Sequence, residues 1–137
     1  MAHWLYKSEP SAWSWDDQVA AGETGTAWTG VRNHLAKKHL QSMKLGDLGF
    51  FYHSNDGKAV VGVVEVIREY YPDHTDPTGR FGMVDLKAVA PLREPVTLEA
   101  IKARPELADM ALIKNSRLSV QPVTAEEWRL VREMGGL

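Results

Sequence analysis

Cysteine is absent from this chain of 137 residues. Disulfide bonds, thiolate nucleophiles and cysteine-held zinc or iron–sulfur centres all require a cysteine side chain, so none of them is open to this protein. The sequence also lacks any apolar run close to the roughly 20 residues that a membrane helix needs, and its first residues lack the charged and apolar regions of a signal peptide. We therefore expect a cytoplasmic protein without a membrane partner.

Familiar catalytic motifs are absent as well. The sequence contains no Gly-x-Ser-x-Gly elbow, no phosphate-cradling loop ending in Gly-Lys-Ser/Thr and no His-Glu-x-x-His pair. The nearest two histidines, His34 and His39, lie five positions apart on an expected helix, where they share no face suited to a metal. A triad of Ser8, His53 and Asp47 is disfavoured by distance, since Asp47 starts the strand that His53 ends, roughly 20 Å away. We expect no catalytic residue, no metal and no cofactor.

The length and composition indicate one globular domain. A chain of 137 residues buries enough of its unfolded surface for one core but not comfortably for two. Hydrophobic residues make up 44% and charged residues 25%, which excludes a disordered or collagen-like chain. We predict a single domain over residues 1–137.

The net charge of −2 conceals a basic segment. Residues 31–45 carry four lysines or arginines and no acid, which leaves −6 on the rest of the chain. Such a patch steers phosphates toward one face of an acidic protein. A solvated helix face carries similar charges, so both interpretations stay open.

Hydrophobic periodicity and turn residues predict strands and helices mixed along the chain. The pattern gives strands over residues 3–8, 48–53, 59–71, 81–89 and 118–123, and helices over 14–22, 33–43, 97–105 and 124–134. Turn residues 55–57 join the second and third strands into a hairpin. These elements are typical of a small, mostly antiparallel barrel of the α+β class. We interpret the apolar stretch 59–66 as an edge strand, so we expect a monomer or a weak homodimer.

Aromatic and polar residues cluster in two short segments near the N-terminus. The first is residues 4–10, Trp-Leu-Tyr-Lys-Ser-Glu-Pro, and the second is residues 28–33, Trp-Thr-Gly-Val-Arg-Asn. A flat base needs an aromatic face for stacking and amide or hydroxyl groups that read its edge. The two segments supply these groups, so the sequence predicts a recognition pocket rather than a catalytic centre.

Trp28 is the expected stacking face of this pocket, because Gly30 lets the backbone approach a ligand closely. A core position for Trp28 is the alternative. Asn33 presents a donor and an acceptor to a base edge, but it also suits the N-cap of the following helix, and both roles can hold together. The other tryptophans of this region are assigned mainly to the core: Trp4, Trp13 and Trp15.

The ends of two expected strands complete the pocket. Ser8 and Lys7 end the first strand, where Ser8 is placed to bond a base edge and Lys7 a phosphate. Hydrogen bonding of Ser8 to local backbone is the alternative. His53 and Ser54 end a second strand at the same mouth, where His53 either donates to a base or phosphate or is simply a satisfied polar residue.

Five separated motifs resemble the EVE domain family. They are Lys7-Ser8-Glu9-Pro10, Trp28 with residues 30–33, residues 46–55, Val61-Gly62, and residues 117–120 with Pro122-Val123. The resemblance runs from Trp4 to about Trp128. It implies a PUA-like fold, a mostly antiparallel β pseudo-barrel with short helices around it, similar to the YTH domain whose pocket reads a methylated adenine. The implied activity is binding of a modified nucleobase without turnover.

The resemblance and the residue patterns together give one candidate site and one partner. The partner is nucleic acid, DNA or RNA, with a modified base, and the alternative is an enzyme acting on a nucleotide or small ring-containing metabolite in the same cavity. The expected base-binding residues are Lys7, Ser8, Trp28, Gly30, Val31, Asn33, Tyr52, His53, Ser54, Leu118 and Ser119. The expected phosphate-binding residues are Arg32, Lys37, Lys38 and Arg117.

Overall fold

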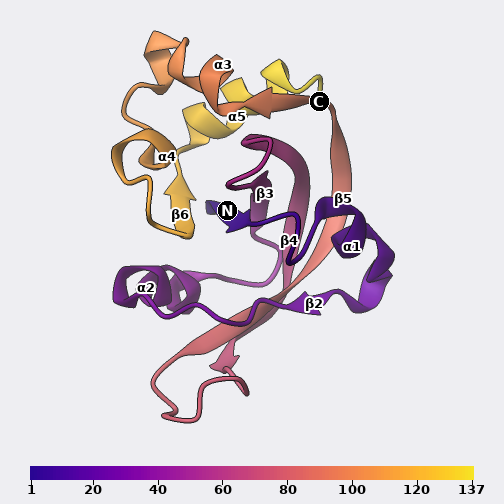
Figure 1. Cartoon of the computed structure of the whole chain (residues 1–137), viewed down its shortest axis with the longest axis vertical. Helices are drawn as coiled ribbons and strands as arrows, with labels where there is room; N and C mark the ends of the chain where they lie inside the picture. The colour runs from indigo at the N-terminus through magenta and orange to yellow at the C-terminus, as the bar shows by residue number, and fades with distance from the viewer.

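Six strands form one curved sheet with the helices packed around it (Figure 1). A computed structural model describes all residues, 1–137. The strands are β1 (His3–Ser8), β2 (Thr26–Ala27), β3 (Leu48–His53), β4 (Ala59–Pro72), β5 (Gly82–Thr97) and β6 (Val120–Val123). They lie in the order β2-β5-β4-β3-β1-β6, and every neighbouring pair is antiparallel except β1 and β3. The α+β class and the hairpin of β3 and β4 are confirmed.

Local capping signals fix where the helices begin. The helices are α1 (Trp15–Ala20), α2 (His34–Ser42), α3 (Leu98–Lys102), α4 (Ala111–Lys114) and α5 (Ala125–Met134). Ser14 and Asp17 form a capping box at the start of α1, and Thr124 and Glu127 form another at the start of α5. Each box gives side-chain acceptors to backbone N–H groups that a helix start leaves unpaired. The four predicted helices are confirmed, with ends that shift by a few residues.

The sheet buries side chains on both faces, because successive residues of a strand point to opposite sides. In β1, Trp4 and Tyr6 belong to one hydrophobic core and Leu5 belongs to the other. The first core also contains residues of α2, together with Trp15 and Trp28. The second contains residues of α3, α4 and α5, which gather beyond the sheet in Figure 1. Because β1 is packed on both faces, its C-terminal residues Lys7 and Ser8 have defined positions.

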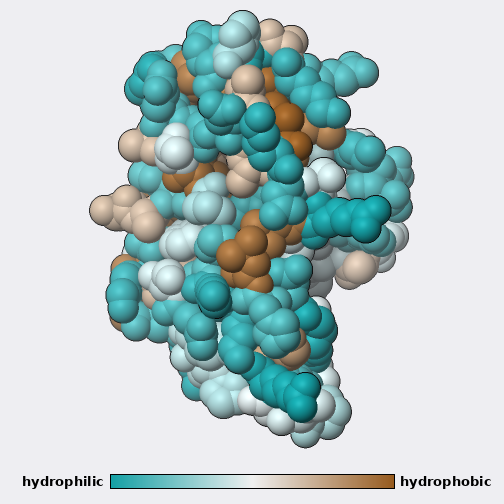
Figure 2. Space-filling model, turned by 90° about the vertical axis from the view of Figure 1, so that its left-hand side faces the viewer, coloured by the Kyte–Doolittle hydropathy of each residue, from teal (hydrophilic) through white to brown (hydrophobic).

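The stretch 59–66 lies inside the sheet and is not an edge strand. Strand β4 pairs with β3 on one side and with β5 on the other, so its backbone groups have no free side for a second copy. The edge-strand prediction is wrong. The side of the molecule that carries α2 and α4 is mainly hydrophilic, with hydrophobic side chains in separate areas (Figure 2). The oligomeric state stays a prediction.

Strand β5 continues past the end that the sequence predicts. The pattern stops at residue 89, whereas the strand runs from Gly82 to Thr97 through Pro91 and Pro95. Proline has no N–H for the hydrogen-bond ladder, so a proline in the sequence is usually interpreted as the end of a strand. Pro91 lies opposite Gly62, next to a shift in the register between β4 and β5, which accommodates it. None of the helices combines the length and the apolar character that a membrane crossing requires.

Candidate functional site

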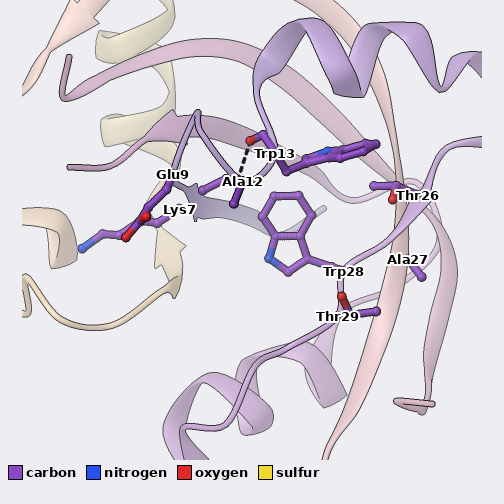
Figure 3. Close-up of a pocket in the computed structure, with 9 residues that line it drawn as sticks. Lys7, Glu9, Ala12, Trp13, Thr26, Ala27, Trp28 and Thr29 are labelled. Carbon is purple, nitrogen blue, oxygen red and sulfur yellow. Dashed lines mark hydrogen bonds between the residues drawn. The ribbon is translucent and has the colours of Figure 1, made fainter. Parts of the chain in front are cut away.

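A cavity of about 420 Å³ opens beside the C-terminal end of β1 and the short strand β2 (Figure 3). Pockets for small ligands have volumes of roughly 300–1,000 Å³. The lining residues are Lys7, Ser8, Glu9, Ala12, Trp13, Thr26, Ala27, Trp28 and Thr29. The structure thus brings Lys7, Ser8 and Trp28 together, as the sequence predicts, while their role in base binding stays a prediction.

Trp28 lines the cavity and belongs to the core at the same time. It is 8% exposed, and its ring meets Tyr6 and Phe51 edge to face, with centroids 5.6 and 5.7 Å away. Its backbone N–H donates to the carbonyl of Val84 at 2.9 Å. The indole N–H makes no hydrogen bond within the protein and is not fully buried, which leaves it open to a ligand. The core position of Trp28 is therefore confirmed, and its role as the stacking face stays a prediction.

Trp13 forms a second aromatic wall of the cavity and also packs against the first hydrophobic core, so its assignment mainly to the core holds only in part. It is only partly buried, and its indole N–H donates to Oε1 of Gln18 at 2.8 Å. Gln18 is fully buried, and its amide donates in turn to the carbonyl of Leu86 at 3.0 Å. These bonds fix the Trp13 ring and occupy its only donor. Figure 3 shows the Trp13 ring edge-on and the Trp28 ring face-on, so the two rings are not parallel.

Ser8 shapes the loop that follows β1. Its hydroxyl donates to the carbonyl of Trp13 at 2.6 Å, the dashed line of Figure 3. The alternative of local backbone bonding is confirmed. Because a hydroxyl has one proton and two lone pairs, Ser8 can still accept a hydrogen bond from a ligand. The carbonyl of Ser8 accepts from the N–H of Ser54 at 2.9 Å, which ties the end of β1 to the end of β3.

His53 does not line the cavity. Its Nε2 accepts from the backbone N–H of Trp15 at 3.0 Å. The Trp15 ring packs so closely on Gly62 that a Cβ there would lie 2.4 Å from it. Burial lowers the pKa of His53, which favours the neutral imidazole that an accepting Nε2 requires. His53 is therefore a satisfied polar residue that binds the first residue of α1, as the alternative interpretation has it, and it does not line the first cavity.

A second, smaller cavity of about 160 Å³ adjoins the first through Lys7. Its lining residues are Lys7, Tyr52, Ser54, Asn55, Lys58, Leu98, Leu112 and Ser116. The ammonium group of Lys7 donates to the carbonyl of Ser116 at 2.5 Å. Burial lowers the pKa of Lys7. Two of the predicted base-binding residues, Tyr52 and Ser54, line this second cavity and not the first.

Five further predicted base-binding residues line neither cavity. Val31 and Leu118 are buried in the core, and Ser119 accepts the backbone N–H of Lys7 at 2.9 Å. Asn33 Oδ1 accepts from the N–H of Ala36 at 3.0 Å, which confirms the N-cap role. The fifth residue is Gly30, whose φ of +85° suits glycine and whose N–H is bound elsewhere in the protein. These residues frame the site instead of lining it.

Asp73 joins the loop after β4 to the segment that follows Trp28. Its buried carboxylate accepts from the N–H of Gly30 at 2.9 Å and from Arg32 at 3.1 Å. The hydroxyl and the N–H of Thr75 donate to its other oxygen. Burial opposes ionisation, but the hydrogen bonds from Thr75, Gly30 and Arg32 outweigh it and lower the pKa of Asp73 to about 2. Arg32 is therefore already paired, which weakens its prediction as a phosphate ligand.

The other predicted phosphate ligands are less constrained. Lys37 places its ammonium group 5.6 Å from the centroid of the Phe81 ring, an arrangement that leaves it free for an anion. Lys38 on α2 and Arg117 before β6 are exposed. The basic segment thus presents cations to solvent, as both of its interpretations require.

The residues of the rejected triad have other partners. Ser8 donates to Trp13, and His53 accepts from Trp15. Asp47 lies before the start of β3 and accepts from the indole of Trp4 at 3.1 Å. No three His, Asp or Glu side chains are grouped so that they could hold a metal ion.

Sequence reasoning missed the part of the first cavity that comes from loops. The missed residues are Glu9, Ala12, Trp13, Thr26, Ala27 and Thr29. A signal existed for Trp13, since it stands immediately before the N-cap Ser14 and so cannot lie on the buried face of α1. The two-residue strand β2 is too short to produce a periodic pattern.

The curved, mostly antiparallel sheet and the cavity at the end of β1 define a PUA-like α+β domain. A YTH domain from Zygosaccharomyces rouxii, solved in complex with N6-methyladenosine RNA, shares the fold with a TM-score of 0.60 and 18% identity, over 99% of this chain and 85% of that one. At this identity the likeness extends to the fold alone. The chain belongs to the EVE domain family, whose model matches residues 2–134.

Several relatives are similar over nearly the whole chain. Human thymocyte nuclear protein 1 is 34% identical over 95% of this chain and 72% of its own length. The structure of human THYN1 in complex with 5-methylcytosine-containing DNA has a TM-score of 0.94 and 32% identity, over 100% of this chain and 99% of that one. A protein from Agrobacterium tumefaciens reaches a TM-score of 0.97 and 52% identity, over 100% and 94% of the two chains.

Proposed function

We propose that this chain is a non-catalytic module that binds nucleic acid and takes a modified nucleobase into the cavity between Trp13 and Trp28. The observation that carries the proposal is the cavity itself, which two tryptophan rings and the polar side chains of Ser8, Thr26 and Thr29 line. The complex of the similar human THYN1 with 5-methylcytosine-containing DNA supports it. We take 5-methylcytosine in DNA as the first candidate base.

The polar groups of the cavity suit a base with an acceptor and an amino group on its edge. The Trp28 indole N–H is a donor without a protein partner, and Ser8 Oγ retains lone pairs because its proton points to Trp13. Thr26 and Thr29 add hydroxyls that can either donate or accept. Cytosine and adenine both present such an edge. The Ser8 proton is engaged by the carbonyl of Trp13 and His53 accepts from Trp15, so these two residues do not form a nucleophile–base pair, which favours binding over turnover.

A binding comparison tests the proposal. Anisotropy titrations should show tighter binding of an oligonucleotide with one 5-methylcytosine than of the same oligonucleotide with cytosine. Burying one methyl group contributes about 0.8 kcal/mol, so we expect a preference of about fourfold or more. Equal affinity for both would reject recognition of this base. Titrations with RNA oligonucleotides of the same sequence show whether the protein prefers DNA or RNA. Mass spectrometry of the recovered oligonucleotide shows whether the base has been changed chemically.

Lys37, which is half-buried, and Lys38, which is exposed, provide a second test on α2. Changing Lys37 and Lys38 together to glutamine should weaken binding of modified and unmodified oligonucleotides equally and reduce the salt slope by up to about two units. Phosphate contacts position a strand and carry no sequence information, so binding of the free nucleoside should not change. Titrations at several salt concentrations measure the slope. An unchanged slope would leave these lysines as an ordinary solvated helix face.

A further inference from the structure

The second cavity shares one lining residue with the first. Lys7 comes from the end of β1 and lines the two cavities. The rest of the second cavity comes from the end of β3, from the turn that follows it, and from Leu98, Leu112 and Ser116, which precede β6. The side chain of Lys7 therefore links the first cavity to a second one that is lined by polar residues.

The charges of the second cavity are positive and uncompensated. Lys7 and Lys58 line it, no carboxylate does, and neither lysine takes part in an ion pair. Lys7 has exchanged part of its hydration for a neutral carbonyl, that of Ser116. Burial lowers its pKa, as expected for a cation that lacks an anionic partner. An anion placed here would supply that partner.

The neutral groups of the cavity also suit an anion. Ser54 contributes a hydroxyl, and Asn55 contributes an amide from a turn with φ of +67°. Hydroxyl and amide donors together with lysine are the groups that bind phosphate oxygens. The volume of about 160 Å³ is small for a second base beside the 420 Å³ of the first cavity.

We propose that the second cavity binds the phosphate group of the same nucleotide whose base occupies the first cavity. This inference rests on the proposed function and adds to it the position of the backbone. Lys58 holds the phosphate from the turn between β3 and β4, and Lys7 holds it at the junction of the two cavities. The chain thus reads a nucleotide, base and phosphate together, and the cations of α2 contact other phosphates of the strand.

Isothermal titration with matched ligands tests the phosphate site. The ligands are 5-methyl-2′-deoxycytidine, its 5′-monophosphate and its 3′-monophosphate. The parent protein should bind one of the two monophosphates roughly tenfold more tightly than the nucleoside, which is the gain in affinity that a charge-assisted hydrogen bond gives. Lys58→Gln should remove most of this advantage and lower the salt slope for an oligonucleotide by about one unit. Arg132→Gln, an exposed charge on α5, is the matched control and should change neither.

Inorganic phosphate provides a measurement that does not depend on the base. In amide NMR spectra it should shift the signals of Ser54, Asn55 and Lys58, and Lys58→Gln should abolish the shifts. Absence of these shifts, or equal behaviour of Lys58→Gln and Arg132→Gln, would overturn the inference. If phosphate shifts these signals while 5-methylcytosine and cytosine oligonucleotides bind equally, the phosphate site stands and recognition of 5-methylcytosine fails.

Discussion

Replacing Trp28 with alanine should lower the free energy of unfolding by about 3–5 kcal/mol, the usual cost of removing a buried tryptophan. The ring is 8% exposed and packs on Tyr6 and Phe51, so its loss leaves a void in the core as well as in the wall of the site. A domain of this kind has about 5–15 kcal/mol of stability in total. The variant should therefore melt at a much lower urea concentration than the parent, and its ligand affinity must be measured below that transition.

Trp13→Ala separates binding from stability. Trp13 is only partly buried, so its removal should cost the fold less while lowering the affinity for a base by about 1–3 kcal/mol, the value of a stacking contact. Urea melts give the free energy of unfolding of each variant, and titrations give its affinity for the base. If Trp28→Ala keeps the parent's stability, the ring is not a core element. If Trp13→Ala keeps the parent's affinity, the ring is not a wall of the binding site.

Asp73→Asn should lower the free energy of unfolding by about 1.5–3 kcal/mol, because it weakens hydrogen bonds to a charged group. The NH2 group of the asparagine is itself a donor, and it would face the N–H donors of Gly30, Arg32 or Thr75. Gly30 follows Thr29, which lines the first cavity, so ligand affinity should fall too. Asp76→Asn is a matched control, since Asp76 binds Thr78 and Phe81 of the same loop but does not contact Gly30. A loss of affinity in both variants would point to the whole loop instead.

The effect of Asp73→Asn should depend on pH in a defined direction. The folded pKa of Asp73 is about 2, below the ordinary 3.8, so the folded protein keeps the carboxylate ionised where the unfolded chain binds a proton. This contribution is complete above the unfolded pKa and disappears as the pH falls through about 2. The difference in stability between parent and variant should therefore be smaller at pH 3 than at pH 7. Urea melts at the two pH values measure it.

The parts of the fold that sequence analysis predicts are those that neighbouring residues determine. Ser14 with Asp17, and Thr124 with Glu127, form their capping boxes within three positions, and the caps of α2 and α3 are equally local. The hairpin of β3 and β4 follows from a short turn between two apolar strands. The position of β4 inside the sheet depends on pairing with β5, whose second half is hidden by prolines.

The candidate site is less predictable because it joins distant segments. Lys7, Ser8 and Trp28 are visible as polar and aromatic residues at expected strand ends, and they do line one cavity. The role of Trp13 depends on Gln18, whose amide reaches the carbonyl of Leu86, 68 residues away in sequence. Such a contact leaves no local pattern. The second cavity likewise combines segments that the sequence places far apart.

The parallel pairing of β1 with β3 also bears on how the protein folds. Ser8 pairs with His53, so the end of β1, which lines the cavity, takes its place in the sheet only after a long stretch of chain has closed into a loop. Closing such a loop costs entropy before any contact rewards it, and contacts between distant residues slow folding. An N-terminal fragment that holds both aromatic segments should therefore bind nothing. A ligand therefore binds only completely folded molecules. The increase in the free energy of unfolding that it causes then measures unfolding of the whole domain.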